Sequence, residues 1–180
     1  MNQAEKKKWK EAGGLKLYYT HEGIGIDSIV FDIGSYYGSW AKTIADKYGA
    51  HIYGFEPVQE FYRRARRGLK NYSKITMLPF GLGSHTRKET MFVSRDSSSL
   101  FFKKGKQETV RIISIEDFMS QFKIAFVDLA CINIQGGEYE LLNFMCSTGL
   151  VLKFNRILLQ FHEYENIGSF AEREEIRKKL

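Results

Sequence analysis

The sequence predicts an α/β fold built on a doubly wound, mainly parallel sheet with helices on both faces. Short runs of β-branched and aromatic residues alternate with segments in which apolar residues recur every three or four positions. Polar or turn-forming residues follow each run, and this rhythm favours parallel strands joined by right-handed crossovers. The chain has 180 residues, of which 43% are hydrophobic. That length and composition fit a globular domain with a substantial core.

The first half of the chain predicts an N-terminal arm followed by three strands and two helices. Residues 1–27 are polar and interrupted by glycines, so we expect an arm with one helix. We assign residues 28–180 to the α/β domain, and Gly49 is expected to end its first helix. The expected strands are 29–31, 51–55 and 74–78, and the expected helices are 36–48 and 58–69.

The second half predicts two further strands. Residues 81–113 are rich in glycine and serine, and we expect an irregular excursion with a hairpin-like pair, Thr90–Val93 and Thr109–Ile113. Ser114 and Ser169 each have the pattern of a helix N-cap followed by acids. The remaining strands are expected at 125–134 and 156–161, with a helix between them around 141–145. Because a doubly wound sheet usually continues, we expect a sheet truncated after its fifth strand and the following helix.

Composition limits the class of protein. The 27 lysines and arginines exceed the 21 acids, so the net charge is +6 and the pI about 9.2. This balance permits anionic partners without requiring them. Cys131 and Cys146 cannot form a disulfide framework and lack metal-ligand spacing. The N-terminus lacks the apolar region of a secretory signal, and no stretch approaches the roughly 18 apolar residues of a membrane span. We therefore expect a cytoplasmic protein with reduced thiols.

Two carboxyl ends of predicted strands carry candidate binding residues. The turn Asp32–Gly38 contains glycines that permit positive φ and close approach of a ligand to the backbone. Glu56 ends the second strand 18 residues after Gly38, where an acid can accept both hydroxyls of a ribose. A ligand-free tight turn and a surface carboxylate are the alternatives. Together the two features indicate an adenosine cofactor.

The glycine spacing distinguishes two adenosine cofactors. A dinucleotide site needs G-x-G-x-x-G, because the pyrophosphate sits on the helix N-terminus. Here Gly34 and Gly38 are four apart, and the bulk of Tyr36 would hinder a pyrophosphate. A cofactor with a carboxylate and a sulfonium needs no such cradle, and Asp32 would suit its ammonium group.

Three segments resemble the signatures of one enzyme family. The segment 30–38 resembles the first motif of class I S-adenosylmethionine-dependent methyltransferases, and 53–57 the second motif of the FkbM family. The segment 128–138 resembles the third FkbM signature, which usually reads D-L-I-K-I-D-V-E-G-A-E. The resemblance covers roughly residues 28 to 165. It implies a Rossmann-like fold, S-adenosylmethionine as methyl donor, and O-methylation of a small-molecule or carbohydrate hydroxyl.

The resemblance also implies roles for residues at matching positions. The turn residues Asp32, Gly34, Ser35, Tyr36 and Gly38 would lie at the methionine part of the cofactor. The ribose hydroxyls would bind at Glu56, beside Pro57, and the adenine would lie near Phe80 and Gly81, which follow the third strand.

The third signature departs from the family pattern. Asn133 and Gln135 stand where the family usually has Asp and Glu, and Cys131 where it usually has Lys. Amides replace carboxylates, so metal-assisted formation of an alkoxide is disfavoured and we expect no metal. Either Asn133 and Gln135 position the substrate by neutral hydrogen bonds, or activity has weakened. Period-two alternation places all three residues on one face of the strand.

His162 follows the fifth strand at the same edge of the sheet. Methyl transfer is accelerated mainly by holding donor and acceptor close together. A hydroxyl acceptor also benefits from a base that titrates near neutral pH, and His162 is the candidate. The alternative is a structural histidine at a strand end.

Other partners and activities remain as alternatives. The arginine run 63–67 lies opposite the apolar stripe of its helix, so it forms either a solvated face or a patch for an anion, to which lysines 103, 104 and 106 could add. No RNA-binding signature accompanies it, and nucleic acid is not an expected partner. The alternative functions are a catalytically silent cofactor-binding module and a nicotinamide-dependent oxidoreductase.

Overall fold

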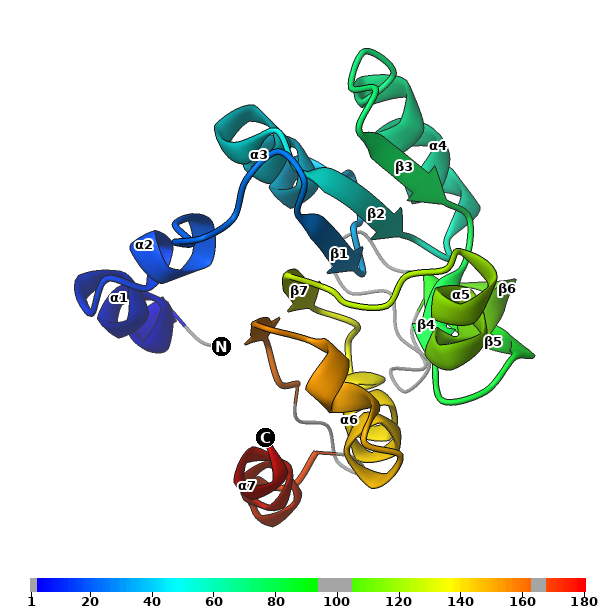
Figure 1. Ribbon diagram of the computed structural model, residues 1–180. Helices are drawn as coiled ribbons and strands as arrows, with labels where there is room; N and C mark the ends of the chain where they lie inside the picture. The colour runs from blue at the N-terminus through cyan, green and yellow to red at the C-terminus, as the bar shows by residue number, and fades with distance from the viewer. Residues whose placement is uncertain (1–2, 94–104, 163–167) are drawn as a thin grey trace.

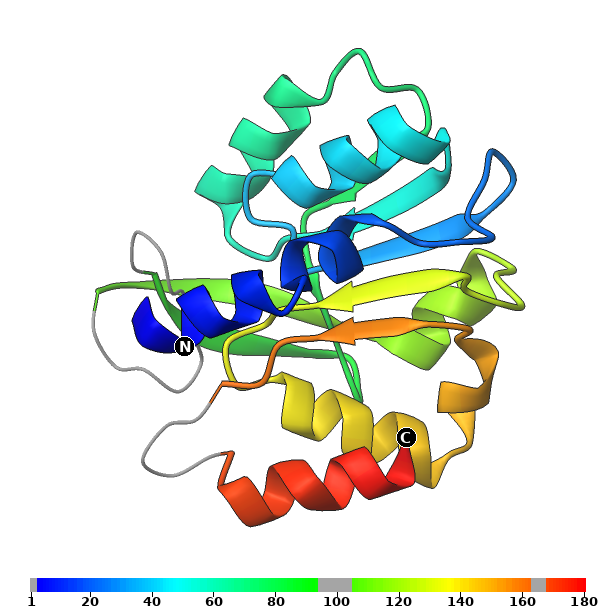
Figure 2. The same ribbon diagram turned by 90° about the vertical axis from the view of Figure 1, so that its left-hand side faces the viewer.

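The computed structural model describes residues 3–93, 105–162 and 168–180. It has three layers, with a parallel sheet between two layers of helices (Figure 1). Turned by 90°, the molecule has α3 (Ser39–Tyr48) and α4 (Gln59–Gly68) above the sheet, and α6 (Glu138–Ser147) and α7 (Phe170–Lys179) below it (Figure 2). The predicted doubly wound α/β fold is therefore confirmed.

The main sheet has five strands in the order β3-β2-β1-β7-β8. Every neighbouring pair in it is parallel. Strands on one side of β1 follow it directly in the chain (β2, β3), whereas those on the other side come later (β7, β8). The segments that leave β1 and β7 therefore turn to opposite faces of the sheet, and open α/β sheets bind their ligands at such a point. The strands are β1 (Ile29–Ile33), β2 (His51–Phe55), β3 (Ile75–Leu78), β7 (Leu129–Ile132) and β8 (Ile157–Leu159).

Alternate residues of the central strands supply two separate cores. Phe31 and Ile33 point to the face covered by α5 (Ile115–Gln121) and α6, where the Phe31, Phe55 and Phe118 rings pack edge to face at 4.9–5.7 Å. Val30 points to the opposite face, against Trp40 and Ile44 of α3. Both faces of β1 are thus buried, which explains its continuous apolar run.

A second, smaller sheet stands beside the main one. Its strands are β4 (Gly81–Gly83), β5 (Arg87–Val93) and β6 (Lys106–Ser114), in the order β4-β6-β5. The pairing of β5 with β6 is antiparallel and sets Thr90 opposite Thr109. The expected hairpin-like pair is confirmed, although its strands are longer than expected. The glycine content of β4 concealed this strand from sequence reasoning.

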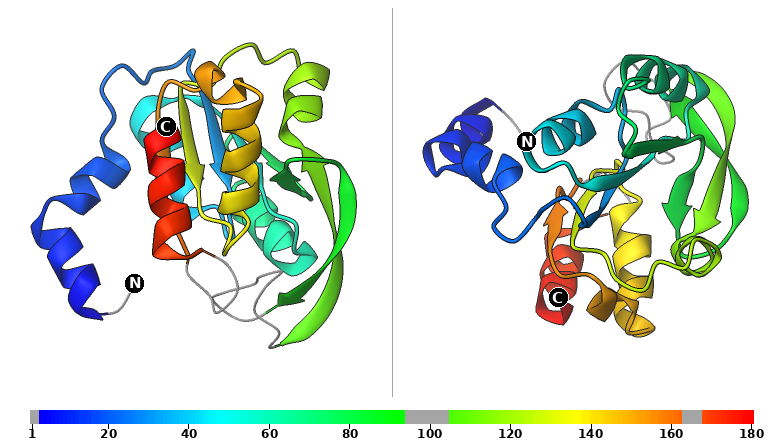
Figure 3. Two further views of the ribbon diagram at one scale, coloured as in Figure 1. Left: turned by 90° about the horizontal axis from the view of Figure 1, so that it is seen from below. Right: turned by 45° about the horizontal axis from the view of Figure 1, so that its top comes forward.

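The N-terminal arm contains two helices, α1 (Gln3–Glu11) and α2 (Gly14–Tyr19), where one was expected. They project beside the main body (Figure 3). The arm is fixed through Tyr18, whose ring centroid lies 6.2 Å from that of Trp40 and whose carbonyl accepts the Trp40 indole N–H at 3.2 Å.

Two predicted element boundaries were wrong for a physical reason. The helix expected from residue 36 begins at Ser39, because Tyr36 and Gly38 have φ of +52° and +76°. The strand expected over 125–134 is limited to β7, and Gln135 has φ of +54°. Left-handed backbone cannot continue either a helix or a strand. The expected caps at Ser114 and Ser169 are confirmed, since their hydroxyls accept the N–H groups of Asp117 and Glu172.

Candidate functional site

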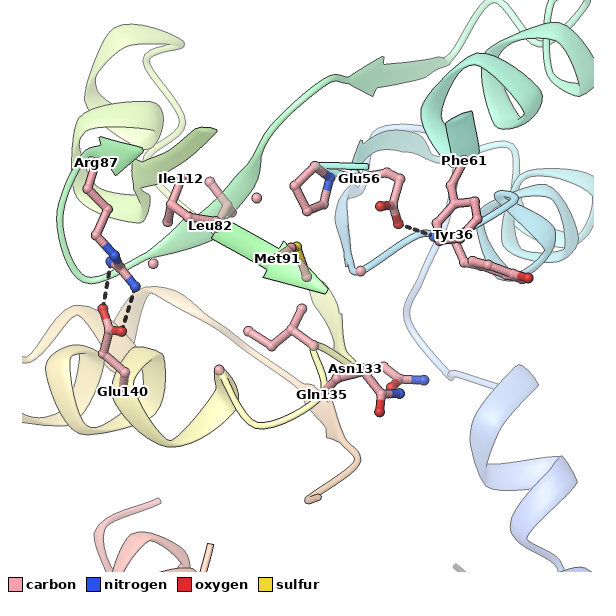
Figure 4. A pocket seen from close by; sticks show the side chains of 16 residues that line it. Tyr36, Glu56, Phe61, Leu82, Arg87, Met91, Ile112, Asn133, Gln135 and Glu140 are labelled. Atoms are coloured by element: carbon pink, nitrogen blue, oxygen red, sulfur yellow. Dashed lines mark hydrogen bonds and ion pairs between the residues drawn. The ribbon is translucent and has the colours of Figure 1, made fainter. Parts of the chain in front are cut away.

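A cavity of about 200 Å³ opens at the carboxyl ends of β1, β2 and β7 (Figure 4). The second sheet forms its opposite wall with Leu82, Met91 and Ile112. Of the residues predicted for cofactor binding or catalysis, seven line it: Gly34, Tyr36, Glu56, Pro57, Gly81, Asn133 and Gln135. The two strand ends identified in the sequence therefore face one space.

Gly34 is required by the turn that follows β1. Its φ is +87°, and a Cβ there would overlap the backbone carbonyl of Asn133 on the neighbouring strand. The N–H groups of Gly34 and Ser35 both donate to the carbonyl of Phe55 at 3.0 Å, which ties the turn to β2. Only glycine permits this close approach of two chains.

Two residues other than glycine have left-handed backbone at the cavity. Tyr36 and Gln135 have φ of +52° and +54°, and both line it. Such conformations are unfavourable for residues with a Cβ and cluster at functional sites. Tyr36 is held by stacking on Tyr37, with ring centroids 3.7 Å apart, and by an edge contact with Phe61 at 4.7 Å.

Glu56 is buried at the cavity wall, with 5% of its surface exposed. Its Oε2 accepts the backbone N–H of Tyr36 at 2.8 Å, and its Oε1 accepts that of Val58 at 2.9 Å. Burial raises the pKa of Glu56 to about 8, although these two N–H groups act in the opposite direction. The carboxylate is thus fixed in direction before any ligand arrives.

Asp32 lies behind the cavity rather than on it. It is buried on the α3 face of β1, beside Cys131 of β7 in the strand register. Its Oδ2 has no hydrogen-bond partner among the described residues. Burial raises the pKa of Asp32 to about 7, with hydrogen bonds from Ser35 and Ala41 opposing the rise. A buried carboxylate oxygen without a donor is costly and suits a cationic ligand group.

A second, open groove of about 1440 Å³ lies over β7 and β8, between the N-terminal helices and α7. Its apolar walls include Trp9, Tyr18 and Phe161, and its polar lining includes Gln160 and His162. Asn133 lines both this groove and the first cavity, and its Oδ1 is buried without a partner among the described residues. The amide of Asn133 therefore stands where the two spaces meet.

The remaining predicted residues lie away from the cavity. The Ser35 hydroxyl donates to the Asp32 carbonyl at 2.8 Å, and Gly38 packs near Leu69 of the segment after α4. The ring of Phe80 packs in the core, 6.0 Å from that of Phe55. Cys131 and Asn133 share a groove as predicted, but Gln135 lines only the first cavity because β7 ends at Ile132.

An ion pair that sequence reasoning missed closes one end of the cavity. Arg87 of β5 donates to both carboxylate oxygens of Glu140 on α6, at 2.9 and 2.7 Å (Figure 4). Partial burial raises the pKa of Glu140, but hydrogen bonds from the Ser84 hydroxyl and from Arg87 outweigh it and lower that pKa. The two residues are 53 positions apart, and the segment that contains Arg87 gave no signal beyond its irregular composition.

Two kinds of feature are absent from residues 3–93, 105–162 and 168–180. No three His, Cys, Asp or Glu side chains gather there to hold a metal ion. No helix in these ranges is long and apolar enough to cross a membrane. Of the basic residues considered as an anion-binding patch, the four arginines of 63–67 are exposed on α4. Lysines 103 and 104 lie outside the described residues.

The strand order and the helices on both faces of the sheet are those of a Rossmann-like α/β protein. A family model described as the methyltransferase FkbM domain matches residues 32–180. The chain belongs to the FkbM methyltransferase family. This is a family of S-adenosylmethionine-dependent methyltransferases. Family membership therefore favours S-adenosylmethionine over a nicotinamide dinucleotide as the cofactor. No curated protein sequence matches the chain significantly.

Solved structures support the same fold. The METTL16 methyltransferase domain is similar with a TM-score of 0.53 and 12% identity, over 96% of this chain and 57% of that one. The product of gene MT0146 from Methanobacterium thermoautotrophicum, described as precorrin 8w decarboxylase, has a TM-score of 0.50 and 14% identity, over 94% and 69%. At these identities the likeness concerns the fold. The chain spans little more than half the length of the METTL16 domain.

Proposed function

We propose that the protein is an S-adenosylmethionine-dependent O-methyltransferase that acts on a small-molecule or carbohydrate hydroxyl. The observation that carries this proposal is the pair of spaces that meet at Asn133. The first cavity contains the buried acid Glu56 and an apolar wall, and the second groove contains His162. A cofactor and an acceptor need such adjoining sites, because methyl transfer depends on bringing the two reacting atoms together.

The first cavity suits the nucleoside part of the cofactor. Glu56 would accept the ribose hydroxyls, and the base would lie between Pro57 and Gly81 and the apolar side chains of the second sheet. Ser35 and Gly38 would support the turn, and Phe80 would support the adenine wall from the core. A cavity of about 200 Å³ is smaller than most ligand pockets. The amino-acid part would therefore extend past Gly34 toward Asn133.

The amino-acid part needs a partner for its ammonium group. Asp32 offers a buried oxygen without a donor among the described residues, and Gly34, two residues further along the chain, lines the first cavity. These features fit the group that the family uses. When bound, S-adenosylmethionine supplies an electrophilic methyl group on a sulfonium.

The second groove would hold the acceptor. Asn133, which lines both spaces, would orient its hydroxyl by a neutral hydrogen bond, and Gln135 would contribute a second one from the side of the first cavity. His162 would take the hydroxyl proton on Nε2 as the oxygen gains its methyl group. An acceptor proton has to leave during O-methylation, and His162, an imidazole that lines this groove together with Asn133, is the side chain that we propose to receive it. The size of the groove permits a sugar or a larger metabolite.

We further propose that residues 1–27 are an arm on the catalytic domain 28–180, and that the protein works in the cytoplasm. Cys131 and Cys146 are both free thiols. Burial raises the pKa of each, which keeps the thiols protonated and unreactive. A reducing compartment would preserve that state.

The first experiment compares thermal unfolding with S-adenosylmethionine, S-adenosylhomocysteine and NAD. At about 100 times its dissociation constant, a ligand stabilises the folded state by about 2.7 kcal/mol. For a chain of this size, that corresponds to a rise in Tm of roughly 5–10 °C. We expect this rise with the two S-adenosyl ligands and none with NAD. A response to NAD alone, or to none of the three, would refute the proposal.

A second candidate function is a catalytically silent module that binds the cofactor. It is favoured by Asn133 and Gln135, which lack the carboxylates that the family usually carries at these positions. Transfer of a radiolabelled methyl group to components of a cell extract separates the two functions. The enzyme transfers label, whereas the module binds the cofactor and transfers none.

A further inference from the structure

Glu138 is a carboxylate with no exposed surface, at the first position of α6. Its Oε2 accepts the backbone N–H of Gly136 at 2.8 Å, and its Oε1 accepts that of His162 at 2.6 Å. The N-terminal end of a helix favours a negative charge. Glu138 thus joins the loop after β7 to the segment after β8, at the edge of the sheet where the proposed reaction takes place.

A third contact of Glu138 goes to an ionisable ring. Its Oε1 lies 3.1 Å from Nδ1 of His162, whose side chain is 13% exposed. If Oε1 accepts this contact, as it accepts the backbone N–H of His162, then Nδ1 is the donor and carries the ring proton. In the neutral ring Nε2 is then an acceptor. The amide nitrogen of Gln160 lies 3.0 Å from Nε2, which fits an amide N–H donated to the single lone pair of Nε2 in the ligand-free protein. A bound acceptor hydroxyl would take the place of this amide at Nε2.

Backbone support alone does not account for this arrangement. The N–H groups of Gly136 and His162 already satisfy one oxygen each of Glu138. The additional contact with Nδ1 fixes the direction and tautomer of a ring that lines the second groove. A carboxylate that selects a histidine tautomer in this way is a familiar arrangement for preparing a general base.

We propose that Glu138 is a positioning residue that keeps His162 in the Nδ1-protonated tautomer, with Nε2 as the accepting nitrogen in the second groove. Glu138 itself touches no substrate. Its effect on methyl transfer rests on the proposed function, because His162 has to receive the acceptor's proton. The tautomer itself does not depend on that function and can be measured without an acceptor.

The tautomer can be read from the ¹⁵N resonances of the imidazole rings. The chain has four histidines, and the signals that disappear in His162→Gln assign those of His162. In the neutral ring of wild-type His162, we expect Nδ1 to be protonated and Nε2 to be unprotonated. In Glu138→Gln we expect a shift toward the Nε2-protonated form, which neutral imidazole prefers in water. Glu116→Gln, an exposed change on α5, should leave the His162 signals unchanged.

Two outcomes would overturn the proposal: an Nε2-protonated His162 in the wild type, or the same tautomer in Glu138→Gln as in the wild type. If Glu138→Gln does not fold, the wild-type spectrum still decides the first point. The melting shift with S-adenosylmethionine is measured on the same samples. If S-adenosylmethionine does not raise the melting temperature of the wild type, the proposed function is rejected. The tautomer of His162 is measured independently of that result.

A rate measurement tests the consequence for methyl transfer, with cell extract as the source of acceptor. We expect Glu138→Gln and His162→Gln each to lower the maximal rate of label transfer about 10²–10⁴-fold, the usual contribution of general base catalysis. The KM for S-adenosylmethionine should stay within about twofold, because neither residue lines the first cavity. Glu116→Gln, an exposed change on α5, should match the wild type. A Glu138→Gln defect confined to KM would contradict a positioning role.

Discussion

The carboxylate of Glu56 accepts the backbone N–H of Tyr36 at 2.8 Å. This bond joins the turn after β1 to the end of β2, two sites that are 20 residues apart in the chain. It also holds Tyr36 in its left-handed conformation, with φ of +52°. A single acid therefore both shapes the turn and presents oxygen atoms to the cavity.

The first prediction concerns cofactor affinity. Glu56→Ala should abolish the rise in Tm with S-adenosylmethionine, because no other group would replace two hydrogen bonds to the ribose. Glu56→Gln should weaken binding strongly, since an amide offers one accepting oxygen in place of two. Glu60→Gln, on the exposed face of α4, should bind as the wild type does. If calorimetry shows that Glu56→Ala binds S-adenosylmethionine as tightly as the wild type does, Glu56 does not bind the ribose of the cofactor.

A second prediction concerns pH and the cofactor-free protein. Burial raises the pKa of Asp32 from 3.8 to about 7 and that of Glu56 from 4.5 to about 8. The folded state therefore holds protons that the unfolded state releases. The resulting stabilisation is complete below about pH 4 and is lost as the pH rises through 7 and 8. We expect the free energy of unfolding to fall by about 1.4 kcal/mol per pH unit for each acid, a total on the order of 5 kcal/mol between pH 5 and 8.

Urea denaturation across this pH range measures the effect. Glu56→Gln should reduce the slope above pH 7, whereas Glu60→Gln should not. Binding of S-adenosylmethionine below pH 7 should release protons, since its ammonium group favours an ionised Asp32. Calorimetry in buffers of different ionisation enthalpy detects that release. A stability that is constant or rises from pH 5 to 8 would contradict the protonated, buried acids.

The third prediction compares two glycines. Gly34→Ala should destabilise the protein by at least about 3 kcal/mol, because the new Cβ meets the Asn133 carbonyl and the left-handed backbone is unfavourable for alanine. Gly68→Ala should stabilise it by about 0.5–1 kcal/mol, since the last residue of α4 has open space around it. Chemical denaturation measures both. Similar stabilities for the two variants would show that the turn tolerates a side chain.

The N-terminal arm provides the fourth prediction, which tests the proposed boundary at residue 27. Deleting residues 1–13 should change stability by about 1 kcal/mol or less, because α1 lies outside the main body. Deleting residues 1–27 should cost about 3 kcal/mol, because it uncovers the rings of Trp40 and Tyr48. It also removes the hydrogen bond from the His21 N–H to the Tyr48 hydroxyl. Equal melting temperatures for the longer deletion and the full chain would refute this account.

Local patterns in the sequence predicted the main sheet well, because its strands and helices are set by short-range periodicity. The stripe of α4 illustrates this, since Phe61 and Ala65 are buried and its arginines are exposed. Boundaries were less predictable where a residue other than glycine has a left-handed backbone, as at Tyr36 and Gln135. That conformation is imposed by tertiary contacts, such as the bond from Tyr36 to Glu56.

Some residues of the candidate site could be predicted from the sequence, and others could not. Gly34 and Glu56 follow strands and could be predicted, because parallel strands end at a common edge. The wall formed by the second sheet could not, since β4 pairs with β6 and Arg87 meets Glu140 only in three dimensions. Glu138 matches the last residue of the third signature, but the sequence did not pair it with His162. Its contact with His162 joins residues 24 positions apart.

The fifth prediction concerns the two amides that stand where the family usually has acids. Chelation of divalent cations should leave the melting temperature and the methyl transfer of the wild type unchanged, because amides are weaker ligands for hard cations than carboxylates. The double variant Asn133→Asp and Gln135→Glu should lose about 1–3 kcal/mol of stability. Its new Asp side chain places a charge where Oδ1 already lacks a partner among the described residues.

Divalent cations should restore part of that loss in the double variant only. At about ten times its dissociation constant, Mg²⁺ would return about 1.4 kcal/mol. Asn155→Asp, at an exposed position, is the matched control and should show neither the loss nor the response. Inhibition of the wild type by a chelator would contradict a neutral acceptor site. Methyl transfer that persists in the presence of chelator would instead support the proposal that His162, which contacts Glu138 through Nδ1, receives the acceptor's proton.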